Sequence, residues 1–123
     1  MGALAPLFDT NILIDCLGGH PAALREVEYA VDRSISVICW LEVMAGATPG
    51  RDAEVREFLD AFKLLPITSA VAERAVLIRR TSRLKLPDAL ILATAQVENR
   101  MLVTRNTRDF AEAQPGVHIP YRL

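Results

Sequence analysis

The stretch LAPLFDTN, residues 4–11, decides the fold of this chain. Its first five residues are apolar enough to form a short buried strand. Its last three, Asp9, Thr10 and Asn11, end that strand and suit the start of a helix, because their side chains accept hydrogen bonds from the free backbone N–H groups of a first turn. The pattern therefore predicts a strand that leads directly into a helix.

The same alternation continues along the chain. Strands that alternate with helices imply an α/β domain with a mostly parallel sheet. There is no internal repeat, low-complexity tract or linker, so we expect residues 1–123 to form one domain. Further helices are predicted over residues 12–17, 21–30, 39–47, 51–62, 69–84 and 88–97, and further strands over residues 34–38, 64–67, 101–104 and 117–119.

The composition is that of a folded globular protein, with 51% hydrophobic and 24% charged residues. No apolar run approaches the roughly 20 residues that span a bilayer. The opening MGALAPLF lacks the basic segment of a secretory signal, so we expect a cytoplasmic protein without a membrane anchor. Cys16 and Cys39 are predicted to be reduced thiols in the core, since they lack metal or redox spacing.

The overall charge gives only a weak indication of a partner. The net charge of −1 provides no global basic field of the kind found on many nucleic-acid-binding proteins. Twelve of the fourteen cationic side chains are arginine, which binds phosphate and carboxylate groups with two parallel hydrogen bonds.

Four acidic residues each follow or interrupt an apolar element. Asp9 follows the first strand, Glu42 lies within an apolar helical segment, Asp88 lies in the first turn of another, and Asp109 follows the strand over 101–104. Ligands of open parallel sheets bind beyond the carboxyl ends of the strands. We therefore expect these carboxylates to converge at that edge, with Glu42 buried because its neighbours are apolar.

Converging carboxylates repel one another unless a cation neutralises them. Oxygen ligands without histidine or cysteine favour Mg²⁺ or Mn²⁺, and such a site suits phosphoryl transfer, in which the metal activates water. Each acid also has a purely structural interpretation. Asp9 would then be a helix cap, Asp88 a partner of the helix dipole and Asp109 a turn residue.

Four segments carry a family resemblance: FDTNILID at 8–15, LEVMAG at 41–46, LPDALILATA at 86–95 and VTRNTRDF at 103–110. In this order they resemble the motif blocks of PIN-domain nucleases, and most of all the VapC-type toxins of bacterial and archaeal toxin–antitoxin pairs. The resemblance runs from about residue 4 to the end of the chain. It implies a PIN-like three-layer sandwich, in which a mostly parallel central sheet is flanked by helices.

The resemblance also implies an Mg²⁺- or Mn²⁺-dependent endoribonuclease. Asp9 and Asp88 would be metal ligands and Glu42 would complete the acidic cluster. Thr10 and Asn11 would hold the Asp9 loop, while Thr104 would line the pocket. The implied partners are the RNA substrate, a VapB-like antitoxin that inserts a segment into the active-site groove, and a second copy in a homodimer.

One position departs from the family pattern. Many relatives carry an aspartate two residues after the threonine that corresponds to Thr104, and here that position is Asn106. Asn106 could still coordinate through its amide oxygen or through a water. Asp109 is the nearest acid, and either joins the catalytic set or only caps the loop. Arg105 and Arg108 flank this place and are candidates for contact with phosphate.

A run of arginines precedes the Asp88 block. Arg79, Arg80 and Arg83 have the spacing of one helix face. That face would guide an RNA backbone, receive an acidic antitoxin segment, or simply be solvated.

Two other functions compete with the nuclease. A phosphatase with Asp9 as nucleophile is disfavoured, because phosphatases of the haloacid dehalogenase type place a second aspartate where this chain has Asn11. A catalytically weak or inactive module that binds RNA or protein is the other alternative, and Asn106 favours it.

Overall fold

The sheet of the computed structural model, which describes residues 4–111 and 114–123, is entirely parallel. Its five strands lie in the order β3-β2-β1-β4-β5, so β1 is central and pairs with both β2 and β4. This order confirms the predicted parallel sheet. The strands are β1 (Pro6–Phe8), β2 (Ser34–Ser36), β3 (Lys63–Leu65), β4 (Met101–Val103) and β5 (Val117–His118).

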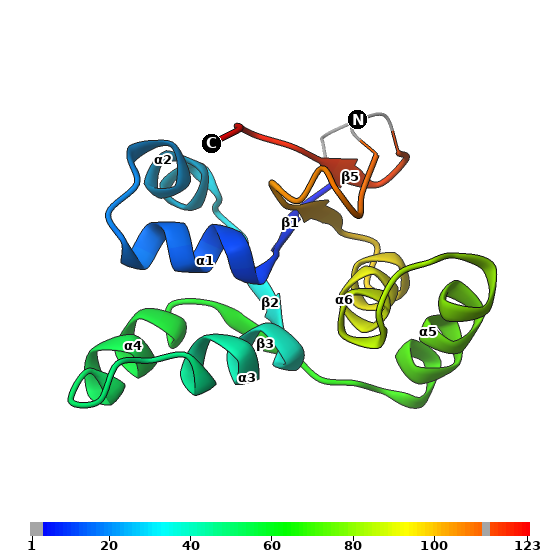
Figure 1. Cartoon of the computed structure of the whole chain (residues 1–123), viewed down its shortest axis with the longest axis horizontal. Helices are drawn as coiled ribbons and strands as arrows, with labels where there is room; N and C mark the ends of the chain where they lie inside the picture. The colour runs from blue at the N-terminus through cyan, green and yellow to red at the C-terminus, as the bar shows by residue number, and fades with distance from the viewer. Residues whose placement is uncertain (1–3, 112–113) are drawn as a thin grey trace.

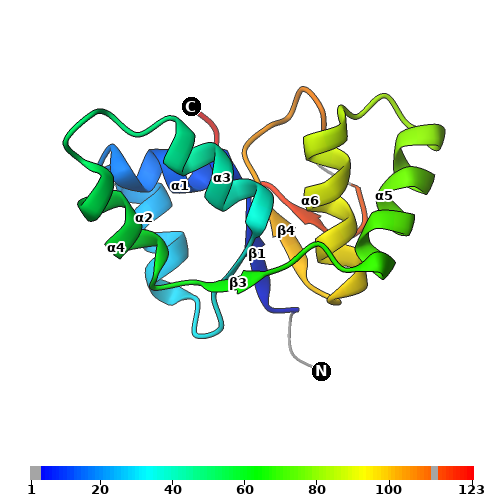
Figure 2. The same ribbon diagram turned by 90° about the horizontal axis from the view of Figure 1, so that it is seen from below.

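Helices cover both faces of the sheet and make three layers (Figures 1 and 2). Figure 2 shows α1 to α4 on one side of the strands and α6 on the other, with α5 outside α6. The helices are α1 (Thr10–Leu17), α2 (Pro21–Tyr29), α3 (Val37–Ala45), α4 (Asp52–Leu59), α5 (Ser69–Thr81) and α6 (Leu86–Val97).

The core follows the central strand. Leu7, Phe8 and Leu102 have no exposed surface, because β1 and β4 are covered on both faces. The predicted burial of the apolar helix α6 is confirmed, since most of its residues from Ala89 to Ala95 are buried. In the part of the chain that the structure describes, no helix is long and apolar enough to cross a membrane.

Both cysteines lie in this core, as predicted. Cys16 and Cys39 are buried and unbonded to each other. Burial raises the pKa of the Cys16 thiol to about 11 and raises that of Cys39 further, because the charged thiolate is poorly solvated there. Both are therefore neutral thiols at pH 7.

Several predicted boundaries differ from those of the structure, and two of them have a clear physical cause. The strand predicted over 34–38 ends at Ser36, whose Oγ accepts a hydrogen bond from the Ile38 N–H at 3.1 Å and caps α3. The helix predicted over 69–84 ends at Thr81. The hydroxyl of Ser82 donates to the Ile78 carbonyl at 2.7 Å, and its backbone is extended, so Arg83 does not lie on the helix. Arg79, Arg80 and Arg83 therefore do not share one helix face.

The junction between β2 and α3 can be tested at Ser36. Replacement by alanine removes the cap of α3, so we expect Ser36→Ala to lower the free energy of unfolding by about 1 kcal/mol. Urea denaturation measures this change. The control is Ser69→Ala, at an exposed position inside α5. Equal stabilities of the two variants would contradict a capping role for Ser36.

Candidate active site

Asp9 is held where the central strand ends. Its backbone N–H donates to the Val103 carbonyl at 2.9 Å and extends the pairing of β1 with β4 by one residue. Asp9 is also the N-cap of α1, because its Oδ1 accepts a hydrogen bond from the Thr10 N–H at 2.8 Å. The predicted N-cap is therefore confirmed. The carboxylate lies at the carboxyl edge of the sheet.

Thr104, directly after β4, holds the other oxygen of Asp9. It is fully buried, and its hydroxyl donates to Asp9 Oδ2 at 2.8 Å. The same hydroxyl accepts hydrogen bonds from Asn11 Nδ2 and from the Asn106 N–H, both at 3.1 Å. Asn11 Oδ1 in turn accepts from the Arg105 N–H at 3.2 Å. One hydroxyl thus joins α1 to the loop after β4.

The carboxyl of Asp9 has a raised pKa, so it binds a proton more tightly than an exposed aspartate does. Burial raises its pKa to about 6, because water is excluded from the charged form. The hydrogen bonds from Thr104 and Thr10 oppose this rise, while the nearby charges of Asp88 and Glu42 add to it. All the hydrogen-bond donors to Asp9 among the described residues are neutral. Its negative charge is therefore uncompensated by any cationic donor in that set.

Glu42 lies beside this site but is exposed, so its predicted burial is wrong. The helix α3 turns Cys39 and Val43 into the core and leaves Leu41 half exposed, with Glu42 on the outward side. Glu42 Oε1 accepts a hydrogen bond from the Thr10 hydroxyl at 2.6 Å. That bond links the outer side of α3 to the first turn of α1.

Asp88 lies in the first turn of α6, as predicted, and is partly buried. Its pKa is raised, first by burial and then by the charges of Asp109 and Glu42, while Lys85 opposes the rise. Since α6 leads back to β4, its N-terminus lies at the same edge of the sheet as Asp9. The charges of Asp9, Glu42 and Asp88 thus act on one another.

The three carboxylates do not form a closed cage. Within residues 4–111 and 114–123, no group of three or more histidine, cysteine, aspartate or glutamate side chains lies close enough together to hold one metal ion. The acids are coupled through their charges, but the tight cluster expected from the sequence is not found among the described residues.

Asn106 and Asp109 bind each other on the far side of the site. Asn106 Nδ2 donates to Asp109 Oδ2 at 2.8 Å, and its Oδ1 accepts from the Asp109 N–H at 3.2 Å. Asp109 is exposed, yet its charge is the largest carboxylate contribution to the raised pKa of Asp88. The two residues therefore form a pair in the loop after β4, and the backbone N–H of Asn106 connects this pair to Thr104.

Arg105 is engaged in a contact that the sequence analysis missed. Its guanidinium binds Asp15 through two nitrogens, and the Tyr121 hydroxyl donates to Asp15 Oδ2 at 2.7 Å. The only local signal was an aspartate within the apolar turn of residues 12–16, which indicates a buried partner. Contact of Arg105 with phosphate remains a prediction, and so does that of Arg108, which is exposed.

The hydroxyl of Thr104 can be tested by removing it. Thr104→Val keeps the shape of the side chain but leaves Asn11 Nδ2 and the Asn106 N–H without their acceptor. We expect the free energy of unfolding to fall by about 1–3 kcal/mol, measured by urea denaturation. Thr107→Val, on the exposed part of the same loop, is the control. A loss no larger than that of the control would show that the network is not structurally important.

Comparison with known proteins gives a consistent family. Residues 7–114 match the model of the PIN domain family. Ribonuclease VapC10 of Mycobacterium tuberculosis is 34% identical over 112 residues, which cover 85% of this chain and 84% of that relative.

Two solved structures have the same fold. A toxin–antitoxin complex from Klebsiella pneumoniae contains a chain that is 46% identical, with a TM-score of 0.90 over 96% of this chain and 99% of that one. In the DNA-bound VapBC from Salmonella typhimurium, a chain that is 23% identical shares the fold alone, with a TM-score of 0.78 over 94% of this chain and 96% of that one. The chain belongs to the PIN domain family, and within that family to the VapC-type proteins.

Proposed function

We propose that this protein is a divalent-metal-dependent endoribonuclease that acts as the toxin of a toxin–antitoxin pair. The observation that carries the proposal is the buried carboxylate of Asp9, which has neutral hydrogen-bond donors and lies within the field of Asp88 and Glu42. A buried carboxylate without a compensating cationic group favours the binding of a cation. The names of a relative, a ribonuclease, and of a neighbour, a toxin–antitoxin complex, support the same activity.

The donor chemistry fits Mg²⁺ or Mn²⁺. The available ligands are carboxylate and amide oxygens, and Mg²⁺ is commonly bound by one or two carboxylates with water and substrate phosphate completing its shell. A closed cage of three acids is therefore not required. Asp9 and Asp88 are the proposed direct ligands, and Glu42 would act through Thr10 or through water. When bound, the metal would lower the pKa of water and stabilise charge on the phosphate.

The side chains of this chain prepare the reaction. Thr104 and the Thr10 N–H hold both oxygens of Asp9 in one orientation, which reduces the reorganisation needed during the reaction. Asp88 is more accessible than Asp9, so a carboxylate oxygen of Asp88 that does not hold the metal would be free to accept a proton from the attacking water. The new bond from that water to phosphorus would form as the bond from phosphorus to the leaving ribose oxygen breaks. Asp109 is proposed to support Asp88 through its charge, which contributes to the raised pKa of Asp88.

The partners follow from the same proposal. We expect RNA as substrate, a VapB-like antitoxin as inhibitor, a homodimer as the working unit, and the cytoplasm as the place of action. The described surface leaves apolar side chains such as Tyr29 and Val31 highly exposed, which supports an interface with another chain.

A catalytically weak or inactive binding module is the second candidate. Two observations favour it, the amide of Asn106 where relatives carry an acid and the lack of a closed acidic cage among the described residues. Calorimetric titration with Mn²⁺ separates the two, since an inactive module would bind no metal at millimolar concentration.

The nuclease proposal is tested by removing the two central acids. We expect Asp9→Asn and Asp88→Asn each to reduce RNA cleavage by roughly a hundredfold or more, because a metal ligand and a proton acceptor are lost. Cleavage of a panel of RNAs is measured with Mg²⁺, with a chelator, and after metal is restored. Asp60→Asn, at the exposed end of α4, is the control and keeps the wild-type rate. Wild-type cleavage by both acidic-site variants would refute the proposal.

A further inference from the structure

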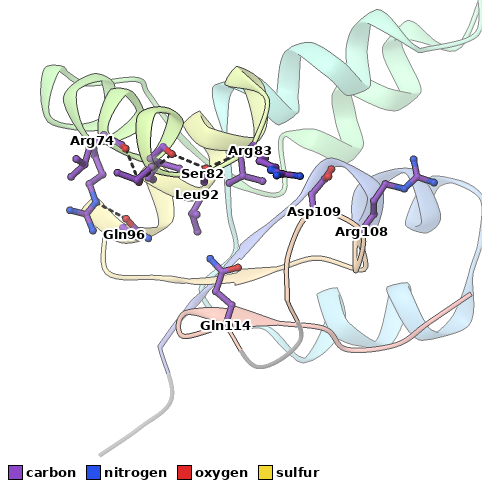
Figure 3. A pocket seen from close by; sticks show the side chains of 12 residues that line it. Arg74, Ser82, Arg83, Leu92, Gln96, Arg108, Asp109 and Gln114 are labelled. Carbon is purple, nitrogen blue, oxygen red and sulfur yellow. Dashed lines mark hydrogen bonds between the residues drawn. The ribbon is translucent and has the colours of Figure 1, made fainter.

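A cavity of about 470 Å³ opens between α5, α6 and the loop after β4 (Figure 3). Its floor is apolar and is formed by side chains such as Ile78, Leu84 and Leu92. Its rim is polar and includes Gln96 and Gln114. In Figure 3 the Gln114 side chain points from the loop before β5 toward the two helices. An apolar floor with amides on the rim suits a ring with polar edges.

The cavity carries positive charge, although the whole chain has a net charge of −1. Three arginines line it, Arg74, Arg83 and Arg108, against one acid, Asp109. All three arginines are exposed. Arginine in such a position attracts phosphate, and a base that enters the cavity brings its phosphate to the mouth.

The cavity is linked to the candidate active site through Asp109. Asp109 lines it and is hydrogen-bonded to Asn106, which in turn binds Thr104 beside Asp9. The charge of Asp109 also reaches Asp88. A strand of RNA whose phosphodiester lies at Asp9 and Asp88 would therefore have a neighbouring nucleotide at the cavity.

The polar groups of the cavity are mainly hydrogen-bond donors. Arg74 Nε donates to Gln96 Oε1 at 2.6 Å, so the amide oxygen is engaged and the NH₂ group of Gln96 is the part that would bind a ligand. Ser82 offers no free donor, because its hydroxyl already donates to the Ile78 carbonyl. A donor can bond to the exocyclic O4 of uracil or O6 of guanine, but not to the amino group that cytosine or adenine carries at the same position, and this position would decide the preference.

We propose that this cavity receives the base of a nucleotide next to the cleaved bond and prefers a base with a carbonyl edge. This inference rests on the proposed ribonuclease function and adds a specificity site to it. Gln96 is the residue that reads the base, and Arg83 binds the phosphate. Arg79 and Arg80 precede the end of α5 and do not line the cavity, so they take no part.

Binding without cleavage tests this site. The affinity of the wild-type chain for fluorescent hexamers of uridine, cytidine and adenosine is measured by anisotropy in the presence of a chelator. Uridine represents the carbonyl-edged bases, because guanosine homopolymers associate with themselves. We expect the uridine hexamer to bind at least about fivefold more tightly than the other two, as hydrogen bonds and stacking to one base can provide.

Two variants separate base from phosphate recognition. Gln96 is exposed, and methionine has a similar volume. Gln96→Met should abolish the preference for uridine and change the affinity for the adenosine hexamer less than twofold. Arg83→Gln should weaken binding of all three hexamers by about tenfold and lower the slope of log affinity against log salt by about 0.7. Arg79→Gln, on α5 and outside the cavity, is the control and changes neither property. Thermal melting checks that each variant is folded.

The outcomes distinguish this inference from the proposed function. Cleavage of RNA by the wild type together with equal affinities for the three hexamers, or a uridine preference that survives Gln96→Met, overturns the base site and leaves the nuclease intact. A Gln96-dependent preference without cleavage supports the base site and refutes the nuclease. A different result would be that an oligoglutamate peptide binds in a way that depends on Arg83, whereas RNA binding does not depend on Arg83. That result shows that the cavity binds an acidic peptide and overturns the inference.

Discussion

Parallel pairing of β1 with β2 and β4 is the constraint on which the rest of the structure depends. It brings the carboxyl ends of neighbouring strands to one edge, where Asp9 follows β1 and Thr104 follows β4. The hydrogen bond between these two side chains joins the strand ends, and Asn11 and Asn106 bind the same hydroxyl. Because α6 leads into β4, its first turn returns Asp88 to that edge.

The same geometry creates an electrostatic problem. The Asp9 carboxylate is buried and has neutral donors, and the described acids around it add negative charge. Burial of an ion without a counter-ion costs several kcal/mol or shifts its pKa. The raised pKa values of Asp9 and Asp88 reflect this cost. A divalent cation bound at this site would remove this cost, so the electrostatics of the site support the proposed function independently of the sequence motifs.

Much of the fold could be predicted from the sequence, because its signals are local. The apolar run before Asp9 and the apolar helix after Asp88 each specify their structure without reference to distant residues. Helix ends were harder to place, since the hydroxyls of Ser36 and Ser82 decide them through hydrogen bonds that spacing does not reveal. The exposure of Glu42 depends on how α3 is rotated against the sheet, which its apolar neighbours did not indicate.

Contacts between distant segments were beyond prediction. Arg105 and Asp15 are 90 positions apart, and Tyr121 joins them from the end of the chain. The position of Asp109 relative to Asp88 is of the same kind, because it depends on how a loop returns across α6. Residue type identified these groups as chemically capable, but only the packed structure brings them together.

The proposed function depends on the binding of a divalent cation by the carboxylate of Asp9. The direct measurement is the pH titration of its side-chain carboxyl carbon by nuclear magnetic resonance, first with a chelator and then with Mg²⁺. Without metal, the pKa of Asp9 is expected near 6. With Mg²⁺ the value should fall well below 6, because the cation stabilises the charged form. A pKa that Mg²⁺ leaves unchanged would contradict the account.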